Sequence, residues 1–175
     1  IEILQKLGED GGPLAEHPGP NSVPGVEAAT GSLGHGLPIG LGHALAARIK
    51  ELNYRVFVLM SDGECNEGSV WEAAMMAAGQ SVGNLTTIID YNKWQATGRS
   101  DDVLQLAPLA DKWRAFGWDV CEIDGHDIEV IKESLNTPSL PTGRPHAVIA
   151  HTVKGKGISF MEDDNNWHYR IPTTD

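Results

Sequence analysis

The sequence contains few of the residues that mark several large classes of protein. Its 175 residues include only two cysteines, Cys65 and Cys121, too few for a framework of disulfide bonds. No apolar run approaches the roughly 20 residues that a membrane-spanning helix needs, and we find no signal peptide. We therefore expect a cytoplasmic protein without a membrane partner.

Basic residues are also scarce. The chain has 13 Lys and Arg against 24 Asp and Glu, which gives a formal net charge of -11. An acidic surface repels the phosphate backbone of nucleic acids, so we expect no nucleic-acid partner. A small phosphorylated ligand is not excluded, because a local pocket can be positive on an acidic protein.

The pattern of apolar residues predicts an α/β fold. Hydrophobic residues make up 41% of the chain, enough for one domain with a core. Apolar runs typical of strands alternate with segments of helical periodicity, which predicts a doubly wound, mostly parallel sheet with helices on both faces. We expect strands at 55–60, 85–91, 118–123 and 146–151, and helices at 36–52, 68–81, 107–116 and 127–135.

The expected core is flanked by irregular segments. Residues 1–35 are rich in Gly and Pro and predict a loop-rich entry, whereas 36–151 form the α/β core. Residues 152–175 predict an irregular tail, in which the acidic run 162–164 is typical of a solvated surface. We expect one domain over 1–175. Since the first residue is Ile1 rather than Met, we also expect an N-terminal segment to be missing.

Two polar side chains follow successive strands. Asp62, in "MSDGECNEGS", comes directly after an apolar run, and Asn92 follows the next strand thirty residues later, the length of one βαβ unit. Because parallel strands present their carboxyl ends at one edge of a sheet, both side chains can face the same ligand. A carboxylate and an amide oxygen suit Mg²⁺ or Ca²⁺. Gly63 and the helix start near Gly68 offer backbone to a phosphate, so the pair indicates a divalent metal that holds a diphosphate.

Simpler interpretations compete with the metal site. Taken singly, Asp62 and Asn92 are typical of helix-capping or turn residues. Gly63 and Gly68 resemble half of a phosphate loop, but Ser69 follows where a nucleotide triphosphatase has Lys. The run "GSLGHG" at 31–36 has no strand before it, which argues against a dinucleotide-binding dehydrogenase.

At these residues the sequence resembles the thiamine diphosphate enzymes, whose G-D-G…N motif stands here as "SDG…N", with Ser61 replacing the first glycine. More narrowly, it is similar to the N-terminal, diphosphate-binding (PP) subunit of split-gene transketolases. The resemblance extends over nearly everything from His17 onward, in the blocks "VPGVEAATGSLGHGLPIGLGHALAAR", "SDGECNEGSVWEAAMMAA", "NLTTIIDYNKWQATGRSDD", "LADKWRAFGWDVCEIDGHD" and "AVIAHTVKGKGISFMEDDNNWHYRIP".

The resemblance implies a set of cofactor and metal contacts. It implies that Asp62 and Asn92 bind the metal through side-chain oxygens and that Trp94 adds its backbone carbonyl. Gly63 would donate its N–H to the diphosphate. The pyrimidine side of thiamine diphosphate would lie along the segment formed by Gly31, Ser32 and Leu33.

The resemblance also implies four further roles. His17, in "EHPGP", matches a histidine that faces the ketose substrate, and His168, in "NNWHYR", matches one that lies at both cofactor and substrate. Lys154, in "TVKGKG", matches a diphosphate-facing lysine of the related deoxyxylulose phosphate synthases. Glu67 matches a glutamate buried at the subunit interface beside the cofactor site.

These similarities imply a transketolase-type subunit that uses Mg²⁺ (or Ca²⁺) and thiamine diphosphate to transfer a two-carbon ketol unit from a ketose to an aldose. The substrates would be sugars or sugar phosphates. The partner would be a C-terminal, pyrimidine-binding subunit that supplies an activating glutamate, in an α2β2 assembly. Two alternatives stay open: a deoxyxylulose-phosphate-type synthase, and a non-catalytic metal- and diphosphate-binding subunit that serves assembly or regulation.

Overall fold

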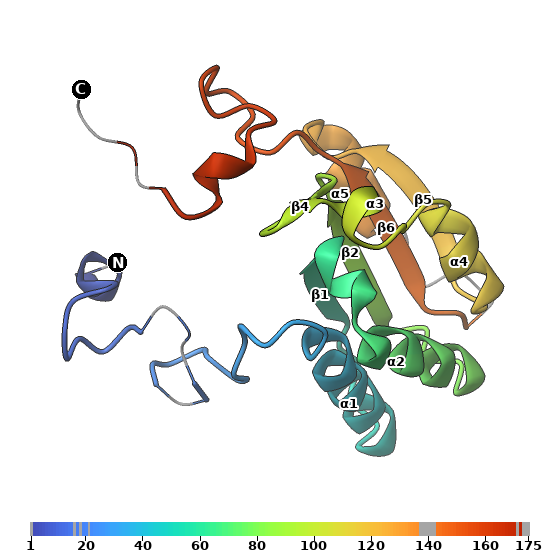
Figure 1. Ribbon diagram of the computed structural model, residues 1–175. Coiled ribbons are helices and arrows are strands. Elements are labelled where there is room, and N and C mark those ends of the chain that lie inside the picture. The colour runs from blue at the N-terminus through green and yellow to red at the C-terminus, as the bar shows by residue number, and fades with distance from the viewer. Residues whose placement is uncertain are drawn as a thin grey trace.

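The computed structural model describes residues 2–15, 17, 19–20, 22–136, 143–170 and 172, most of which form an α/β domain (Figure 1). The elements, with η for 3-10 helices, are η1 (Glu2–Lys6), α1 (Gly36–Ile49), β1 (Val56–Ser61), η2 (Gly63–Asn66), α2 (Gly68–Gly79), β2 (Leu85–Tyr91), β3 (Trp94–Gln95), β4 (Gly98–Arg99), α3 (Ser100–Val103), α4 (Leu109–Ala115), β5 (Asp119–Asp124), α5 (Ile128–Asn136), β6 (His146–His151) and η3 (Asn165–His168).

Four strands form one fully parallel sheet in the order β1–β2–β6–β5. The register places Ser61 beside Asp90 and Tyr91 beside His151. The carboxyl ends of β1, β2 and β6 are therefore level along one edge of the sheet. The predicted parallel α/β fold is confirmed, and the segments after these three strands start close together.

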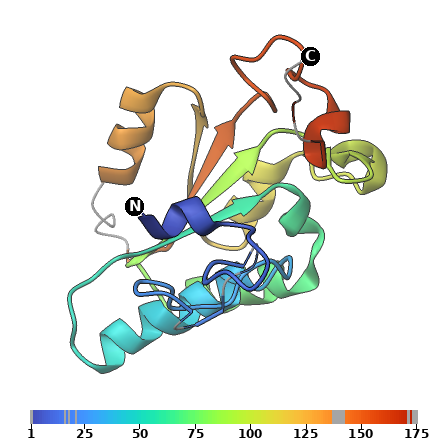
Figure 2. The same cartoon turned by 90° about the vertical axis from the view of Figure 1, so that its left-hand side faces the viewer.

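Helices cover the two faces unequally, as Figure 2 shows. On one face α1, α2 and α4 pack against alternate strand residues, among them Val58 and Ile89. Trp113 of α4 fills the space between this layer and the sheet: it is fully buried, with its ring 5.2 Å from Trp71 of α2 and 4.9 Å from Trp118. The main cluster of buried hydrophobic residues lies on this face. Burying one large aliphatic side chain such as Ile89 contributes roughly 2 kcal/mol to the stability of the fold.

Among the described residues, α5 is the one helix on the opposite face. A cavity of about 300 Å³ lies between α5 and the sheet, lined by residues that include Leu59, Val148 and Leu135. Leu59 on β1 is 73% exposed, although the end of α5 approaches the start of β1, where Arg55 donates to the Leu135 carbonyl at 2.7 Å. The fold is thus closed on one face and partly open on the other.

Several boundaries differ from the predicted ones. Strands β2 and β6 occupy the predicted residues, but α1 ends at Ile49 because Glu51 takes the left-handed conformation with φ 55°. The β3–β4 hairpin and α3 follow Asn92 in a region predicted as loop, and η3 interrupts the tail that was predicted to be irregular. Both additions lie at the carboxyl edge of the sheet.

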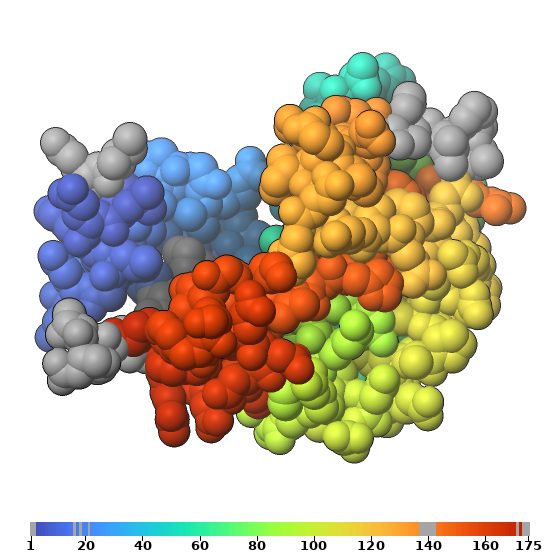
Figure 3. Space-filling view, turned by 90° about the horizontal axis from the view of Figure 1, so that it is seen from above, coloured from blue at the N-terminus to red at the C-terminus, as the bar shows by residue number. Residues whose placement is uncertain are grey.

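The segments before α1 and after β6 leave the domain on the same side (Figures 1 and 3). Seen from above in Figure 3, the tail lies beside the β3–β4 hairpin, which is coloured yellow-green. Within the described ranges, none of the helices combines the length and the apolar character needed to cross a bilayer.

Candidate functional site

Asp62 ends the first strand inside the protein. Its side chain is fully buried, and its two carboxylate oxygens accept three hydrogen bonds. Oδ1 accepts from the Gly63 N–H at 3.0 Å, whereas Oδ2 accepts from the Lys93 N–H at 3.0 Å and from Ser100 Oγ at 2.8 Å. Asp62 caps η2, as the simpler interpretation predicts, but it also contacts the loop that begins at Asn92.

The burial of Asp62 leaves its charge poorly compensated. Burial raises the pKa of the Asp62 carboxyl above its ordinary value, and the charge of Asp90 acts in the same direction, while hydrogen bonds from Ser100, Gly63 and Lys93 lower it. The three donors are two backbone N–H groups and one hydroxyl, so none of them carries a positive charge. A divalent cation would supply the missing charge and favour the ionised carboxylate.

Asn92 is oriented by a second carboxylate. Its Nδ2 donates to Asp90 Oδ2 at 3.0 Å, and its Oδ1 accepts from the Trp94 N–H at 2.9 Å. Asp90 in turn accepts a short hydrogen bond from Thr152 Oγ1. With Nδ2 committed to Asp90, the remaining lone pair of Asn92 Oδ1 is left for a cation.

The backbone at Gly63 has an unsatisfied donor beside it. A Cβ built on Gly63 would lie 3.2 Å from Gln95 Cγ, so the Gln95 side chain packs directly against this glycine. Gln95 Nε2 is buried and has no hydrogen-bond partner among the described residues. In the structure the Gly63 N–H, which the resemblance assigns to the diphosphate, donates to the Asp62 carboxylate. A buried amide donor without an acceptor next to a glycine suits an anionic ligand such as a diphosphate.

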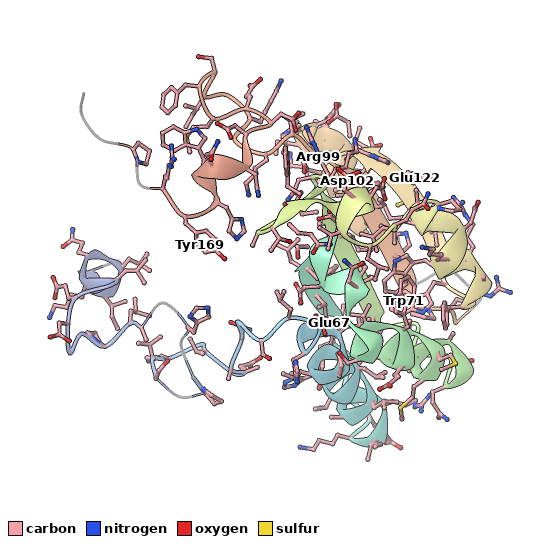
Figure 4. The ribbon with its side chains drawn as sticks, in the orientation of Figure 1. Glu67, Trp71, Arg99, Asp102, Glu122 and Tyr169 are labelled. Atoms are coloured by element: carbon pink, nitrogen blue, oxygen red, sulfur yellow. The ribbon has the colours of Figure 1, made fainter. Side chains whose placement is uncertain are left out.

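The segment 31–36 is fixed against η2 and the start of α2. The Gly34 N–H donates to Glu64 Oε2 at 3.0 Å, and Ser69 Oγ donates to the Gly34 carbonyl at 2.8 Å. Gly34 has φ 77°, and a Cβ there would lie only 2.5 Å from Glu67 Cβ. Glu67 is exposed at the start of α2 (Figure 4), next to this segment.

Gly31, Ser32 and Leu33 are exposed just upstream, with His17 beside them. A Cβ on Gly31 would lie 2.0 Å from His17 Cδ2, and Gly31 has φ 107°. Only glycine fits at this position, and its absence of a side chain lets the His17 ring approach the backbone. The structure thus brings the predicted pyrimidine-side segment and the predicted substrate histidine together.

Lys154 and His168 form a pair in the tail. Lys154 Nζ lies 3.2 Å from His168 Nδ1. Partial burial and the positive charge of Lys154 lower the pKa of His168, so at neutral pH the imidazole accepts at Nδ1 and carries its proton on Nε2. Lys154 also lines a cleft of about 530 Å³ together with Asp90 and Asn92. The cleft joins the tail to the carboxyl end of β2.

The donor set at this edge fits Mg²⁺ and a diphosphate. Among the described residues, no three His, Cys, Asp or Glu side chains come together as a metal site. A cation here would thus rely on one carboxylate, an amide oxygen, a backbone carbonyl and ligand oxygens, the mixture that Mg²⁺ commonly takes. Another cavity, of about 560 Å³, lies along the β1 edge and is lined by none of the predicted site residues.

The sequence-based prediction does not include several residues of the site, among them Asp90, Gln95, Ser100 and Glu64. Asp90 carried a usable signal, because residues i and i+2 of a strand point to the same side and "DYN" places Asp90 and Asn92 in that relation. The other three lie in the short elements η2, β3 and α3, which are too short to give a periodic pattern in the sequence.

Comparison with known proteins identifies the family of this chain. The thiamine diphosphate binding domain of transketolases matches residues 1–170. The chain belongs to the transketolase family.

Two transketolase relatives illustrate the relationship. The chain is 44% identical over 174 residues to a subunit of the apulose-4-phosphate transketolase of Phocaeicola vulgatus, covering 99% of this chain and 62% of that protein. It is 40% identical over 162 residues to a subunit of the 6-deoxy-6-sulfo-D-fructose transketolase of a Clostridium species, covering 93% and 59%. The chain therefore spans about three fifths of these curated relatives, and the predicted similarity to split transketolases is confirmed.

Solved transketolase structures share the fold. The transketolase of Campylobacter jejuni superimposes with a TM-score of 0.87 at 27% identity, covering 94% of this chain and 27% of that one. A transketolase mutant from Pichia stipitis gives a TM-score of 0.82 at 30% identity, covering 89% and 25%.

Proposed function

We propose that this chain binds thiamine diphosphate through a divalent metal ion, Mg²⁺ or Ca²⁺, held by Asp62, Asn92 and the Trp94 carbonyl. The observation that carries the proposal is the fully buried Asp62 carboxylate, which touches the loop after Asn92 and has only neutral donors around it. When bound, thiamine diphosphate supplies a nucleophilic carbon and an electron sink for cleaving the bond next to a ketose carbonyl. The chain's residues bind and orient it.

The other predicted residues would contact different parts of the cofactor and the substrate. Gly63 and Gln95 would face the diphosphate, and Lys154 would add positive charge from the cleft that it shares with Asn92. His168 would present the Nε2–H, since its Nδ1 accepts from Lys154. His17 and Gly31 to Leu33 would line the far end of the site, where a ketose meets the reacting carbon. All these groups would position the cofactor and the substrate and would exclude water, and they come from several loops that surround the site.

We further propose a two-carbon ketol transfer from a ketose to an aldose, carried out together with a pyrimidine-binding partner in an α2β2 assembly. Two relatives are named as subunits of transketolases that act on a phosphorylated sugar and a sulfonated sugar, which supports an anionic sugar as substrate. The exposed Glu67 beside the 31–36 segment suits a residue that a partner would cover. The mass of the purified active species tests the assembly.

Calorimetric titration with thiamine diphosphate, in Mg²⁺ and in chelator, tests the cofactor site. We expect saturable binding that needs the metal and that weakens more than about 100-fold in Asp62→Asn. Asp127→Asn is the matched control, because Asp127 also caps a helix start through its carboxylate but lies at α5. Equal losses in both variants, or binding that ignores the chelator, would contradict the proposed site. Binding without ketol transfer in the presence of the partner would favour the non-catalytic alternative.

A further inference from the structure

One carboxylate, Asp163, ties the tail to the β3–β4 hairpin. Arg99 donates from Nη1 to Asp163 Oδ1 at 2.7 Å and from Nη2 to Oδ2 at 2.5 Å. The Trp94 indole Nε1 also donates to Oδ1, at 2.8 Å. The Arg99 guanidinium lies 3.8 Å from the centre of the Trp94 ring, so the three side chains form one cluster. Figure 4 shows Arg99 on the side of the hairpin that faces the tail.

The backbone of Asp163 is held as firmly as its side chain. Its N–H donates to the Lys154 carbonyl at 2.9 Å, and it takes the left-handed conformation with φ 56°, which is uncommon for a residue with a side chain. A second tie runs parallel, because Asn165 Nδ2 donates to the Ala96 carbonyl at 3.1 Å. Residues 154–165 are thus fastened to residues 94–99 at two points.

Stability alone does not explain this cluster. The side chains of Arg99 and Asp163 are 38% and 52% exposed, and exposed ion pairs contribute little to the free energy of unfolding. The cluster joins two segments that both carry residues of the proposed site. Trp94 carries the carbonyl proposed as a metal ligand, while Lys154 and His168 are the proposed diphosphate and substrate residues.

We propose that Asp163 is a positioning residue. Through its contacts with Arg99 and Trp94 it holds the tail so that Lys154 and His168 face the segment from Asn92 to Trp94, which is proposed to bind the metal. This inference rests on the proposed function. Because binding linkage is reciprocal, it has two consequences: loss of the cluster weakens the metal-dependent binding of thiamine diphosphate, and binding of thiamine diphosphate protects the tail.

The arrangement of charges agrees with a permanent rather than a switchable tie. The hydrogen bonds from Arg99 and Trp94 lower the pKa of Asp163 to about 2, so the carboxylate stays ionised throughout the neutral range. Arg99 and Lys93 are the cations that contribute, and the negative charge of Asp102 on α3 acts on Arg99 as well. The exposed Asp102 therefore offers a control in which the same charge is removed while the three-residue cluster remains.

The test combines hydrogen exchange with cofactor titration on the full chain. In Asp163→Ala without ligand, we expect amides of 154–168 to exchange about tenfold faster, and those of β2 and β6 to exchange as in the wild type. Mg²⁺-dependent affinity for thiamine diphosphate should fall about tenfold, as for other residues that orient metal ligands. Arg99→Lys should have an affinity for thiamine diphosphate between those of the wild type and Asp163→Ala, and Asp102→Asn should match the wild type. The Arg99→Ala, Asp163→Ala double variant should lose no more affinity than either single variant, because both changes remove the same contact.

Two results would overturn the positioning role: unchanged exchange of the tail in Asp163→Ala, or faster exchange with unchanged affinity for the cofactor. With the partner present, a raised KM for the ketose at nearly constant core stability would support it. Failure of the wild-type chain to bind thiamine diphosphate would instead contradict the proposed function. The wild-type titration thus separates the two failures.

Discussion

Ser100 Oγ donates a 2.8 Å hydrogen bond to Asp62 Oδ2, and both side chains are buried. Ser100 begins α3, a short helix that follows the β3–β4 hairpin. The hairpin therefore returns the chain to Asp62 after it has passed Asn92 and Trp94. The Lys93 N–H and the Ser100 hydroxyl both donate to Asp62 Oδ2, so the two ends of the segment 93–100, which contains Trp94, meet at this one carboxylate.

Ser100→Ala should loosen that loop. Removing the hydroxyl leaves Asp62 Oδ2 with one buried donor fewer, which we expect to lower the free energy of unfolding by about 1–2 kcal/mol. Mg²⁺-dependent binding of thiamine diphosphate should weaken about tenfold, because the carboxylate loses a group that orients it. Urea denaturation and calorimetry measure the two effects.

Ser134→Ala is the matched control for that variant. Ser134 Oγ donates to the Ile131 carbonyl within α5, away from Asp62. The control should bind the cofactor as the wild type does. Unchanged binding in Ser100→Ala would mean that Asp62 is oriented without this hydroxyl.

Gly34 is expected to be intolerant of any side chain. Gly34→Ala would place a Cβ 2.5 Å from Glu67 Cβ and 2.7 Å from Ser69 Oγ at a φ of 77°. We expect a loss of about 2 kcal/mol in thermal or urea denaturation, together with weaker cofactor binding as the 31–33 segment shifts. Gly42→Ala in α1, with open space around its Cβ position, should stabilise by about 0.5–1 kcal/mol. Equal effects at both positions would argue against a fixed 31–36 segment.

Gln95 offers a variant in which stability and binding should move apart. Gln95→Met removes the buried amide that has no partner among the described residues, so the free energy of unfolding should stay the same or rise by about 1 kcal/mol. Affinity for thiamine diphosphate should nevertheless fall about tenfold, since one donor to the diphosphate is lost. The exposed Gln105→Met serves as control. Unchanged affinity in Gln95→Met would leave the orphaned amide without a ligand.

His146 at the start of β6 should make folding sensitive to mild acid. Burial lowers the pKa of His146, and Arg55 acts in the same direction, whereas Asp119 raises it. The unfolded chain therefore takes up a proton near pH 6.5, but the folded chain does so only at lower pH. The associated stability is complete above about pH 6.5 and is lost as the pH falls through the folded value.

Urea denaturation between about pH 7.5 and 5 checks this. His146→Gln should show a flatter decline in the free energy of unfolding than the wild type. The exposed His43→Gln should keep the wild-type decline. Parallel curves for wild type and His146→Gln would contradict the assignment to His146.

The sequence predicts the sheet well because its strands are strongly patterned. The apolar runs at 85–91 and 146–151 are β2 and β6 residue for residue, since a strand buried on both faces leaves few alternatives. Asp62 and Asn92 follow β1 and β2, and these two strands are neighbours in the sheet, as their spacing in the sequence predicts. The resemblance, rather than periodicity, supplies His17, Lys154 and His168.

The hairpin and the tail could not be predicted from pattern. Strands β3 and β4 have two residues each, too short for any periodicity to register. Asp163 belongs to an acidic run that is typical of a solvated surface, and it is indeed exposed, but that pattern gives no sign of its hydrogen bonds with Arg99 and Trp94. Its contacts with Arg99 join the tail to the two-residue strand β4, 64 residues away in the sequence, and only the folded chain brings them together.

The most direct test is a crystal structure grown with thiamine diphosphate and Mn²⁺, a stand-in for Mg²⁺ whose position is given by its anomalous signal. We expect one peak within about 2.5 Å of Asp62, the Asn92 amide oxygen and the Trp94 carbonyl oxygen, in contact with the diphosphate. A peak at another cluster of carboxylates, or a cofactor bound without metal at this edge, would contradict the site proposed for Asp62 and Asn92.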